Sequence, residues 1–420
     1  MKTFGWDTVF AIKTDQVNAM LAANSEKTVL DFTVPLPGGS DRKASGRFLA
    51  WQITDGGSSE IIHLKLTIAD GTLSDGGNSY PLRGLTLVIA THLRWIERTN
   101  QEEELQFDYN RLGEPDNPPE PGELAVIALR DPDRALSAEL NALLAFALGG
   151  FLVQNAGSVR FVFAAVNLVP PATNSWLTPQ QNAYGYYQAE GSLQGFLVIY
   201  SVTNDRDISQ LQRTVDPTVL PTTTNASFAI SDELYLTNII APSLGNAFST
   251  GTDAFLYDSG QGVLRNTRRL HTRTVRSGLI NYYPFIDALE VRSGDGALQG
   301  LYGGGVDLKA GISMTYTIGA NNAAHFTDGI LQFAADPRPS ESHSAHIPWY
   351  WFIGGLIVIA IIEIVVPIIS NDIAGQISND NRERLALGKY PPSSILWGGS
   401  SAISVTDIKV NGAMWLSGNI

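Results

Sequence analysis

The side chains best suited to catalysis are few and scattered. Six of the 420 residues are histidines, and none has the His-Glu-x-x-His spacing that places two zinc ligands on one face of a helix. His343 and His346 are three residues apart, but they lie in a Ser- and Pro-rich segment. The chain has no cysteine, which excludes disulfides, thiolate metal ligands and a thiol nucleophile. We therefore predict no catalytic residue, no metal site and no cofactor.

Two glycine-rich stretches also lack catalytic spacing. Gly56-Gly57-Ser58-Ser59 does not have the Gly-x-Ser-x-Gly pattern of a nucleophile elbow. Gly303-Gly304-Gly305 is not followed by the Gly-Lys-Ser/Thr of a phosphate-binding loop, and it is typical of a bend in a curved strand. Both patterns favour a binding protein over an enzyme.

One basic cluster could bind an anion. Arg269, His271 and Arg273 alternate, so they would share one face of a strand over Arg269–Val275, where they could meet a lipid phosphate or an acidic partner. The alternative is a solvated sheet face. Because the whole chain carries 28 basic and 41 acidic residues, a net charge of −13, we predict no nucleic-acid binding.

A long apolar segment, Trp349–Ile369, could contact a membrane. Its 21 residues would cross a bilayer of ~30 Å as a helix. Glu363 would cost about 2.5–3.5 kcal/mol or more in lipid, and Pro367 disturbs the last turn. We therefore favour a helix enclosed by a curved sheet, with membrane insertion as the alternative. The candidates for membrane contact are Trp349, Trp351 and Phe352.

Two strand–helix units organise the rest of the chain. Val9–Ile12 reads as a strand that leads through Thr14, a candidate cap, into a helix over Asp15–Ala23. Ser227–Ile230 is a second strand, and Ser231 is a candidate cap for a helix that starts at Asp232. Both units contain Phe-Ala-Ile followed by a hydroxyl residue and an acid. The helix positions that could line an apolar groove are Val17, Met20, Leu21, Ile239, Ile240, Leu244 and Phe248.

The remaining pattern is mostly β. The acidic, Pro-rich stretch 100–123 predicts an exposed loop, Asp131-Pro132 predicts the start of an apolar helix, and Val306–Ile318 predicts one strand. No run of alternating βα units appears, so we expect an α+β fold with antiparallel sheets. A Pro- and Thr-rich stretch places a linker at 211–225 between domains over 1–210 and 226–420.

Several short motifs resemble one known family. Gly5-Trp6-Asp7, Trp51-Gln52-Ile53 and the glycine-serine run that starts at Gly56 are similar to the P-47 and OrfX-type proteins encoded beside clostridial toxins. That family resembles the tubular lipid-binding (TULIP) superfamily. The resemblance implies two tandem TULIP-like domains, each a curved antiparallel sheet wrapped around a long helix. It supplies no catalytic motif.

Three functions remain open from the sequence. The first is a non-enzymatic protein that binds lipid or another apolar ligand as an accessory of a bacterial toxin or secreted complex. The second is an interaction scaffold with closed cores that binds a toxin or a sister accessory protein, and the third is membrane insertion through 349–369. The first residues have no apolar core or cleavage site of a signal peptide, which predicts the cytoplasm, with release by another route as the alternative.

Overall fold

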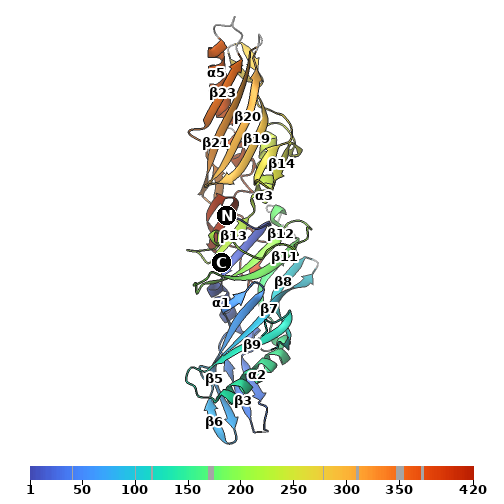
Figure 1. The fold of residues 1–420 in the computed structure, drawn as a ribbon, viewed down its shortest axis with the longest axis vertical. Helices are drawn as coiled ribbons and strands as arrows, with labels where there is room; N and C mark the ends of the chain where they lie inside the picture. Colours follow the sequence, from blue (N-terminus) through green and yellow to red (C-terminus); the bar gives the residue numbers. More distant parts are fainter. Residues whose placement is uncertain are drawn as a thin grey trace.

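Three large β-sheets follow one another along the long axis of an elongated molecule (Figure 1). The computed structural model describes residues 1–39, 41–99, 101–114, 117–168, 175–277, 279–308, 312–346, 354–369 and 373–420. Strands dominate this described part, helices are few, and all strand pairs except β8–β9 are antiparallel. Both chain ends lie at the middle of the molecule, beside the central sheet (Figure 1).

The central sheet joins the two halves of the chain. From edge to edge its strands are β11 (Gln181–Gln188), β12 (Gly195–Val202), β1 (Thr8–Lys13), β13 (Ala226–Ile230), β26 (Ala413–Asn419) and β25 (Ser404–Asn411). Each half contributes its opening strand and its last hairpin in the same order outward from the β1–β13 pair. Phe10 lies opposite Phe228 in that pair, so the phenylalanines of the two Phe-Ala-Ile repeats meet at a pseudo-two-fold axis.

The central sheet is buried on both faces. On one face Phe10 and Ile12 belong to the main core, while on the other Val9 and Ala11 belong to a second apolar cluster. The predicted linker residues cover this second face, where the Nε1 atom of Trp415 donates to the backbone oxygen of Val219 at 2.6 Å. The predicted linker therefore packs against both halves, and the domain boundary itself stays a prediction.

The lower sheet contains ten strands. Its path is β2 (Asp31–Pro35), β3 (Lys43–Phe48), β5 (Ile61–Asp75), β7 (Thr86–Thr99), β9 (Gly122–Arg130), β8 (Glu102–Leu112), β10 (Val162–Asn167) and β24 (Ile395–Trp397). Both β4 (Gln52–Ser58) and β6 (Asn78–Pro81) pair with β5. Helix α1 (Thr14–Ala23) packs on β4 and β12, and α2 (Ala138–Gln154) packs on β8 and β9. Because β24 comes from the end of the chain, this sheet also draws on both halves.

The upper sheet belongs to the second half alone. Its path is β14 (Phe255–Asp258), β15 (Val263–Asn266), β19 (Phe285–Gly294), β20 (Ala297–Asp307), β21 (Ser313–Thr327) and β22 (Ile330–Phe333). Also, β16 (Leu270–His271) pairs with β19 and β23 (Ser340–His346) with β21, while β17 (Val275–Ser277) and β18 (Ile280–Tyr282) form a separate hairpin.

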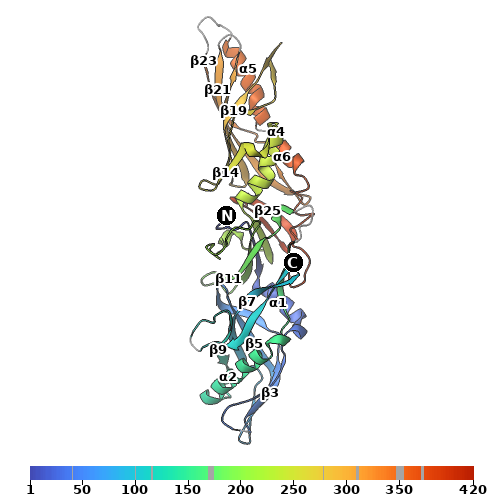
Figure 2. The same ribbon diagram turned by 90° about the vertical axis from the view of Figure 1, so that its right-hand side faces the viewer.

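Helices line one side of the upper sheet (Figure 2). The helix after β13 runs through α3 (Asp232–Tyr235), a π-helical segment (Leu236–Ile240) and α4 (Ala241–Ala247), and α4 packs against α6 (Ile373–Asp380). Helix α5 (Gly354–Pro367) places Val358, Ile361 and Val365 in the main core. Among the described residues, no helix is both long and apolar enough to cross a membrane.

Four predictions about elements are wrong. The strand predicted over Arg269–Val275 is interrupted, because β16 covers only Leu270–His271 and β17 begins at Val275. The stretch predicted as an acidic loop contains strand β8, because Leu105, Phe107 and Tyr109 alternate between its acids and pack into or against the core. Helix α2 begins seven residues after Asp131, at Ala138. The segment predicted as one strand over Val306–Ile318 contains the end of β20 and the start of β21, which pair with each other.

The two predicted caps have different outcomes. The Ser231 side chain accepts a hydrogen bond from the Leu234 amide at 3.1 Å and caps α3, as predicted. Thr14 does not cap α1, because its hydroxyl donates to the Gly195 carbonyl at 3.2 Å and Thr14 is already the first helical residue. Similarly, Ser137 rather than Asp131 caps α2.

Candidate ligand-binding site

The groove candidates of the first half lie in a filled core. Val17 and Leu21 on α1 are at most 1% exposed, and Met20 is half-buried against the same core. A reciprocal pair of hydrogen bonds between the Asn18 amide group and the backbone of Ile53 fixes α1 on β4. These residues therefore hold the helix to the sheet as part of the main core.

The candidates of the second half divide into two groups. Ile239, Ile240 and Leu244 are fully buried in the main core. Phe248, the residue after α4, is 6% exposed and lines a cavity of about 200 Å³ between the end of α4, the region around α6 and the segment after β16. The longer helix of the second half thus brings its last apolar side chain to an opening.

The cavity has an apolar wall and a polar rim. Its apolar wall consists of Ala247, Phe248, Ile368, Ile369 and Ile373. Asn246, Thr272, Arg273 and Gln376 complete the lining. The cavity therefore brings together one predicted groove residue, Phe248, and one predicted headgroup residue, Arg273, which are 25 positions apart in the sequence. An apolar wall next to a cation and amides suits an amphiphile with an anionic or polar head.

The other two residues of the basic cluster lie beside β19. Arg269 donates to Asp287 at 2.6 Å, and its guanidinium lies 3.7 Å from the centre of the Phe285 ring. His271 lies opposite Phe285 in the β16–β19 pair and is exposed. Of the three predicted headgroup residues, Arg273 alone lines the cavity.

The membrane-contact candidates cannot be placed on the structure. Trp349, Trp351 and Phe352 lie outside the described residues. In the described part of this segment, α5 turns one side into the core and leaves Glu363 exposed. An exposed Glu363 stays hydrated in this structure, and the cost given above would apply only if the segment entered lipid.

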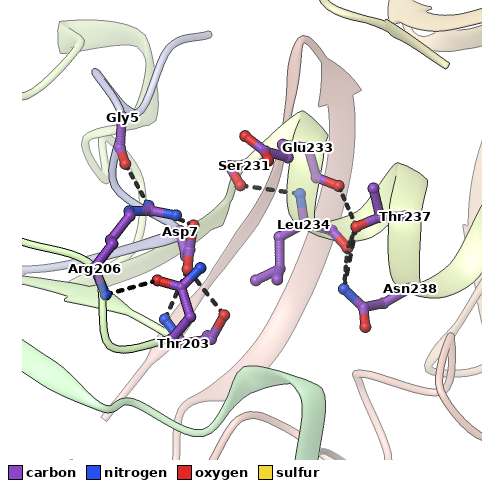
Figure 3. A network of polar contacts seen from close by, with 10 residues as sticks. Gly5, Asp7, Thr203, Arg206, Ser231, Glu233, Leu234, Thr237 and Asn238 are labelled. Carbon is purple, nitrogen blue, oxygen red and sulfur yellow. Dashed lines mark hydrogen bonds and ion pairs between the residues drawn. The ribbon is translucent and has the colours of Figure 1, made fainter. Parts of the chain in front are cut away.

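A polar network that the sequence did not predict lies beside the central sheet, next to the start of α3 (Figure 3). The Asp7 carboxylate is 4% exposed and accepts hydrogen bonds from the Thr203 amide at 2.7 Å and from Arg206 at 2.7 Å. Arg206 also donates to the Gly5 carbonyl, and the Ser231 amide donates to the Asp7 carbonyl at 2.8 Å. Paired in this way, the buried charge of Asp7 is compensated. Asp7 belongs to the Gly5-Trp6-Asp7 motif, which was the available signal.

Next to this network, Glu233 occupies an unfavourable position for a charge. Burial raises the pKa of the Glu233 carboxyl above its ordinary value; Arg206 opposes this, and the negative charges of Asp7 and Asp232 add to it. Glu233 lies in the first turn of α3, at the contact between the central sheet and the upper half (Figure 3).

Three of the six histidines make local contacts or line a hollow. His63 lines a surface hollow of the lower sheet, and burial lowers its pKa. The Nε2 atom of His92 lies 2.8 Å from the Pro119 carbonyl, and His343 lies 3.2 Å from Glu341. Across the described residues, no group of three or more acidic or histidine side chains is arranged to hold a metal ion.

Comparisons with known proteins agree with this architecture. A P47 structure from Clostridium botulinum A2 aligns with all of this chain and 98% of its own, with 23% identity and a TM-score of 0.74. A second P47 structure, from Clostridium botulinum E1, aligns over the full length of both chains with 19% identity and a TM-score of 0.73. At these identities the structures establish the fold.

Sequence comparisons point the same way. Protein P47 of Clostridium botulinum (strain Kyoto / Type A2) is 23% identical over 433 residues and covers both chains completely. Protein OrfX3 of the same strain is 25% identical over 281 residues, which is 59% of this chain and 55% of OrfX3. The family model described as OrfX-like, Protein OrfX2/OrfX3/P47, matches residues 3–320. The chain therefore belongs to the OrfX-like family.

Proposed function

We propose that the protein binds a lipid or another amphiphile without chemical conversion, as an accessory of a bacterial toxin or secreted complex. The observation that carries this proposal is the cavity in which Phe248 and three isoleucines meet Arg273. The cavity combines the apolar and cationic chemistry that an acyl chain with a polar head requires. Its position at the end of the second opening helix agrees with the groove that the sequence analysis proposed.

The proposal includes two tandem TULIP-like units. Support comes from the central sheet, where each half supplies an opening strand and a final hairpin related by a pseudo-two-fold axis. A helix follows the opening strand in both halves, and a second apolar helix precedes the last strands. In this interpretation the two units share the central sheet. They differ in their opening helices, because only the second helix ends at the cavity.

The size of the cavity limits what binds. About 200 Å³ lies below the ~300–1,000 Å³ typical of pockets that bury a drug-sized ligand. The cavity therefore takes the end of an apolar chain, and deeper entry requires the helices to separate. Each methylene group that enters gains ~0.8 kcal/mol. A polar head would then meet Arg273 and Gln376 at the rim.

The test fills the cavity. Ala247 lines the cavity and is half-buried, so the change Ala247→Phe places a ring in the binding space. The matched control is Gly375→Phe on neighbouring α6, where an added side chain would begin in open space. We expect native mass spectrometry to detect co-purified lipid in wild type and control, and a fluorescent fatty acid to bind at least tenfold more weakly to the Ala247→Phe variant. Equal binding by all three proteins would exclude this cavity.

The second candidate function is an interaction scaffold. It is favoured by the closed packing of Ile239, Ile240 and Leu244, together with the filled core under α1. Under this proposal the protein binds a toxin or a sister accessory protein through its surface. Absence of co-purified lipid, with no binding of the fluorescent fatty acid, would favour the scaffold over the lipid-binding function.

A further inference from the structure

We propose that an apolar groove between α2 and β9, in the lower part of the molecule, docks a basic amphipathic segment of a partner protein. The groove has a volume of about 290 Å³ and lies far along the chain from the cavity beside α4. Its main lining residues are Leu112, Val126, Ile127, Ala142, Ala145 and Phe146. We refer to this surface as the α2 groove.

The α2 groove exposes large apolar side chains without a partner in the described chain. Phe146 is 62% exposed and Ile127 is 50% exposed, although both belong to regular elements that pack on the lower core. Helix α2 carries a single charged residue, Glu139, over its entire length. A helix face that only faces water usually carries several charges, so the composition of α2 indicates that its outer face is covered in the working state.

A β-bulge produces part of this exposure. In the β7–β9 pair Val88 lies opposite Ala128 and Ile89 opposite Val126, which leaves Ile127 as the extra residue. The bulge turns the Ile127 side chain out of the sheet, where it lines both the α2 groove and a neighbouring hollow. Bulges re-aim side chains in this way at functional surfaces.

Small residues let another chain approach closely. Ala142 and Ala145 lie on the groove side of α2, and Gly149 contacts β9 so tightly that a Cβ atom there would lie 2.6 Å from the Val126 side chain. The neighbouring hollow, of about 470 Å³, extends the surface past Ile61, His63 and Pro118. Two hollows on either side of Ile127 suit a polypeptide segment with two apolar anchors, more than a flat bilayer surface.

The charges around the groove select a basic partner. Glu123 lies beside Gly113 at the groove, Glu114 lines the adjoining hollow, and Glu139 lies one turn before Ala142 on α2. The nearby Arg111 already pairs with Glu123 at 3.1 Å and with Glu120 at 3.6 Å. Glu139 in turn lies 3.3 Å from Arg42. The four carboxylates, Glu114, Glu120, Glu123 and Glu139, outnumber the two arginines, Arg42 and Arg111, that pair with them, so the rim keeps a net negative charge that would repel anionic lipid headgroups. Complementary charge requires Lys or Arg next to the apolar anchors of the partner.

The test uses two synthetic helices as probes. Both are 18-residue amphipathic peptides with a leucine stripe, and their polar positions are all Lys in one and all Glu in the other. We expect the full-length protein to bind the Lys peptide, with the affinity falling as salt rises, and to bind the Glu peptide at least tenfold more weakly. Fluorescence anisotropy measures both.

Matched variants locate the binding surface. We expect Phe146→Asp and the milder Phe146→Ala to weaken Lys-peptide binding at least tenfold and several-fold, respectively. Leu256→Asp changes a residue of the upper sheet that is 65% exposed, and it serves as the control that leaves binding unchanged. Glu139→Lys should weaken binding and flatten the salt dependence. Thermal unfolding confirms that each variant is folded.

Three outcomes overturn the proposal. Equal binding of the Lys and Glu peptides would show that the protein does not select a basic partner. Unchanged binding of the Lys peptide by both Phe146 variants would show that the peptide does not bind in the α2 groove. Phe146-dependent self-association in light scattering, or Phe146-dependent flotation with phosphatidylcholine vesicles, without Lys-peptide binding, would assign the groove to a second copy of the chain or to a lipid surface instead.

Discussion

The two strand–helix units that open the halves of the chain share residues but use them differently. Strands β1 and β13 lie side by side in one sheet, and Phe10 contacts Phe228 with ring centroids 5.3 Å apart. Helix α1 ends at Ala23, and its apolar side lies on a filled core. The helix after β13 is longer, is capped by Ser231, and brings Phe248 to a cavity.

This difference teaches that helix length, more than apolar spacing, decides which unit reaches the cavity. Val17 and Leu21 have the same periodic pattern as Ile240 and Leu244, and all four are buried. The second helix continues to Ala247 and carries Phe248, which packs in the same core and also lines the cavity. The following predictions test whether the two units are equivalent in the core and different in their helices.

The largest expected effect comes from the shared core. Phe10→Ala and Phe228→Ala each remove a ring that is at most 2% exposed, so each should lower the free energy of unfolding by about 3–5 kcal/mol. The double variant should show a coupling energy of about 0.5–1.5 kcal/mol, because the rings meet edge to face. Urea unfolding measures all three. A strongly asymmetric result, with one change nearly neutral, would break the equivalence of the two units.

A smaller effect is expected at the helix cap. Ser231→Ala removes the acceptor for the Leu234 amide and should cost about 1 kcal/mol. The comparison is Thr14→Ser, which keeps the hydroxyl that donates to Gly195 and should cost less, since Thr14 caps no amide of α1. The same urea titrations compare the two variants. A larger loss of unfolding free energy for Thr14→Ser than for Ser231→Ala would contradict the conclusion that only the second helix depends on a side-chain cap.

The smallest effect concerns pH. Because the pKa of Glu233 is raised above its ordinary value of 4.5, its ionised form is less favourable in the folded state than in the unfolded state. The penalty is absent below about pH 4.5 and grows as the pH rises through the folded pKa. Glu233→Gln should therefore raise Tm slightly at pH 7 and leave it unchanged at pH 4, with a small magnitude because solvent screens the partly exposed side chain. Glu26→Gln, on an exposed turn, is the control. An equal rise in the Tm of Glu233→Gln at pH 4 and pH 7 would contradict the raised pKa of Glu233.

Local sequence patterns predicted the elements in which side-chain periodicity or a capping residue pointed to one type of structure. The two opening strands, the Ser231 cap and the apolar character of α2 all follow from side-chain periodicity and capping chemistry. The prediction of a loop was wrong for β8, because its many acidic residues masked the alternation of apolar residues. Leu105 and Tyr109 in this strand are buried between acids. The prediction was also wrong at Asp131, because a capping residue followed by proline also occurs in an ordinary turn. Here the Asp131 carboxylate accepts a hydrogen bond from the Leu136 backbone amide, before α2 begins.

Candidate site residues were harder to predict than elements. Apolar helix positions look alike in sequence whether they fill a core or line an opening, so Leu244 and Phe248 could not be distinguished. Arg269 and Arg273 carry the same charge and look alike in sequence, yet Arg273 lines the cavity and Arg269 contacts Asp287 and Phe285 on the sheet. The exposure of Ile127 depends on a register shift between two strands, which no local pattern reports.

The sequence by itself determined the repeated strand–helix openings, the high strand content and the family resemblance. It also determined the absence of cysteine and of histidines at metal-ligand spacing. All of these depend on residue types and short spacings. Only the tertiary structure decided that β1 and β13 share one sheet, that β24 crosses into the lower sheet, and that Phe248 meets Arg273 at a cavity. Those features arise from contacts between residues distant in the chain, and their free energy comes from burial that a local window of sequence does not contain.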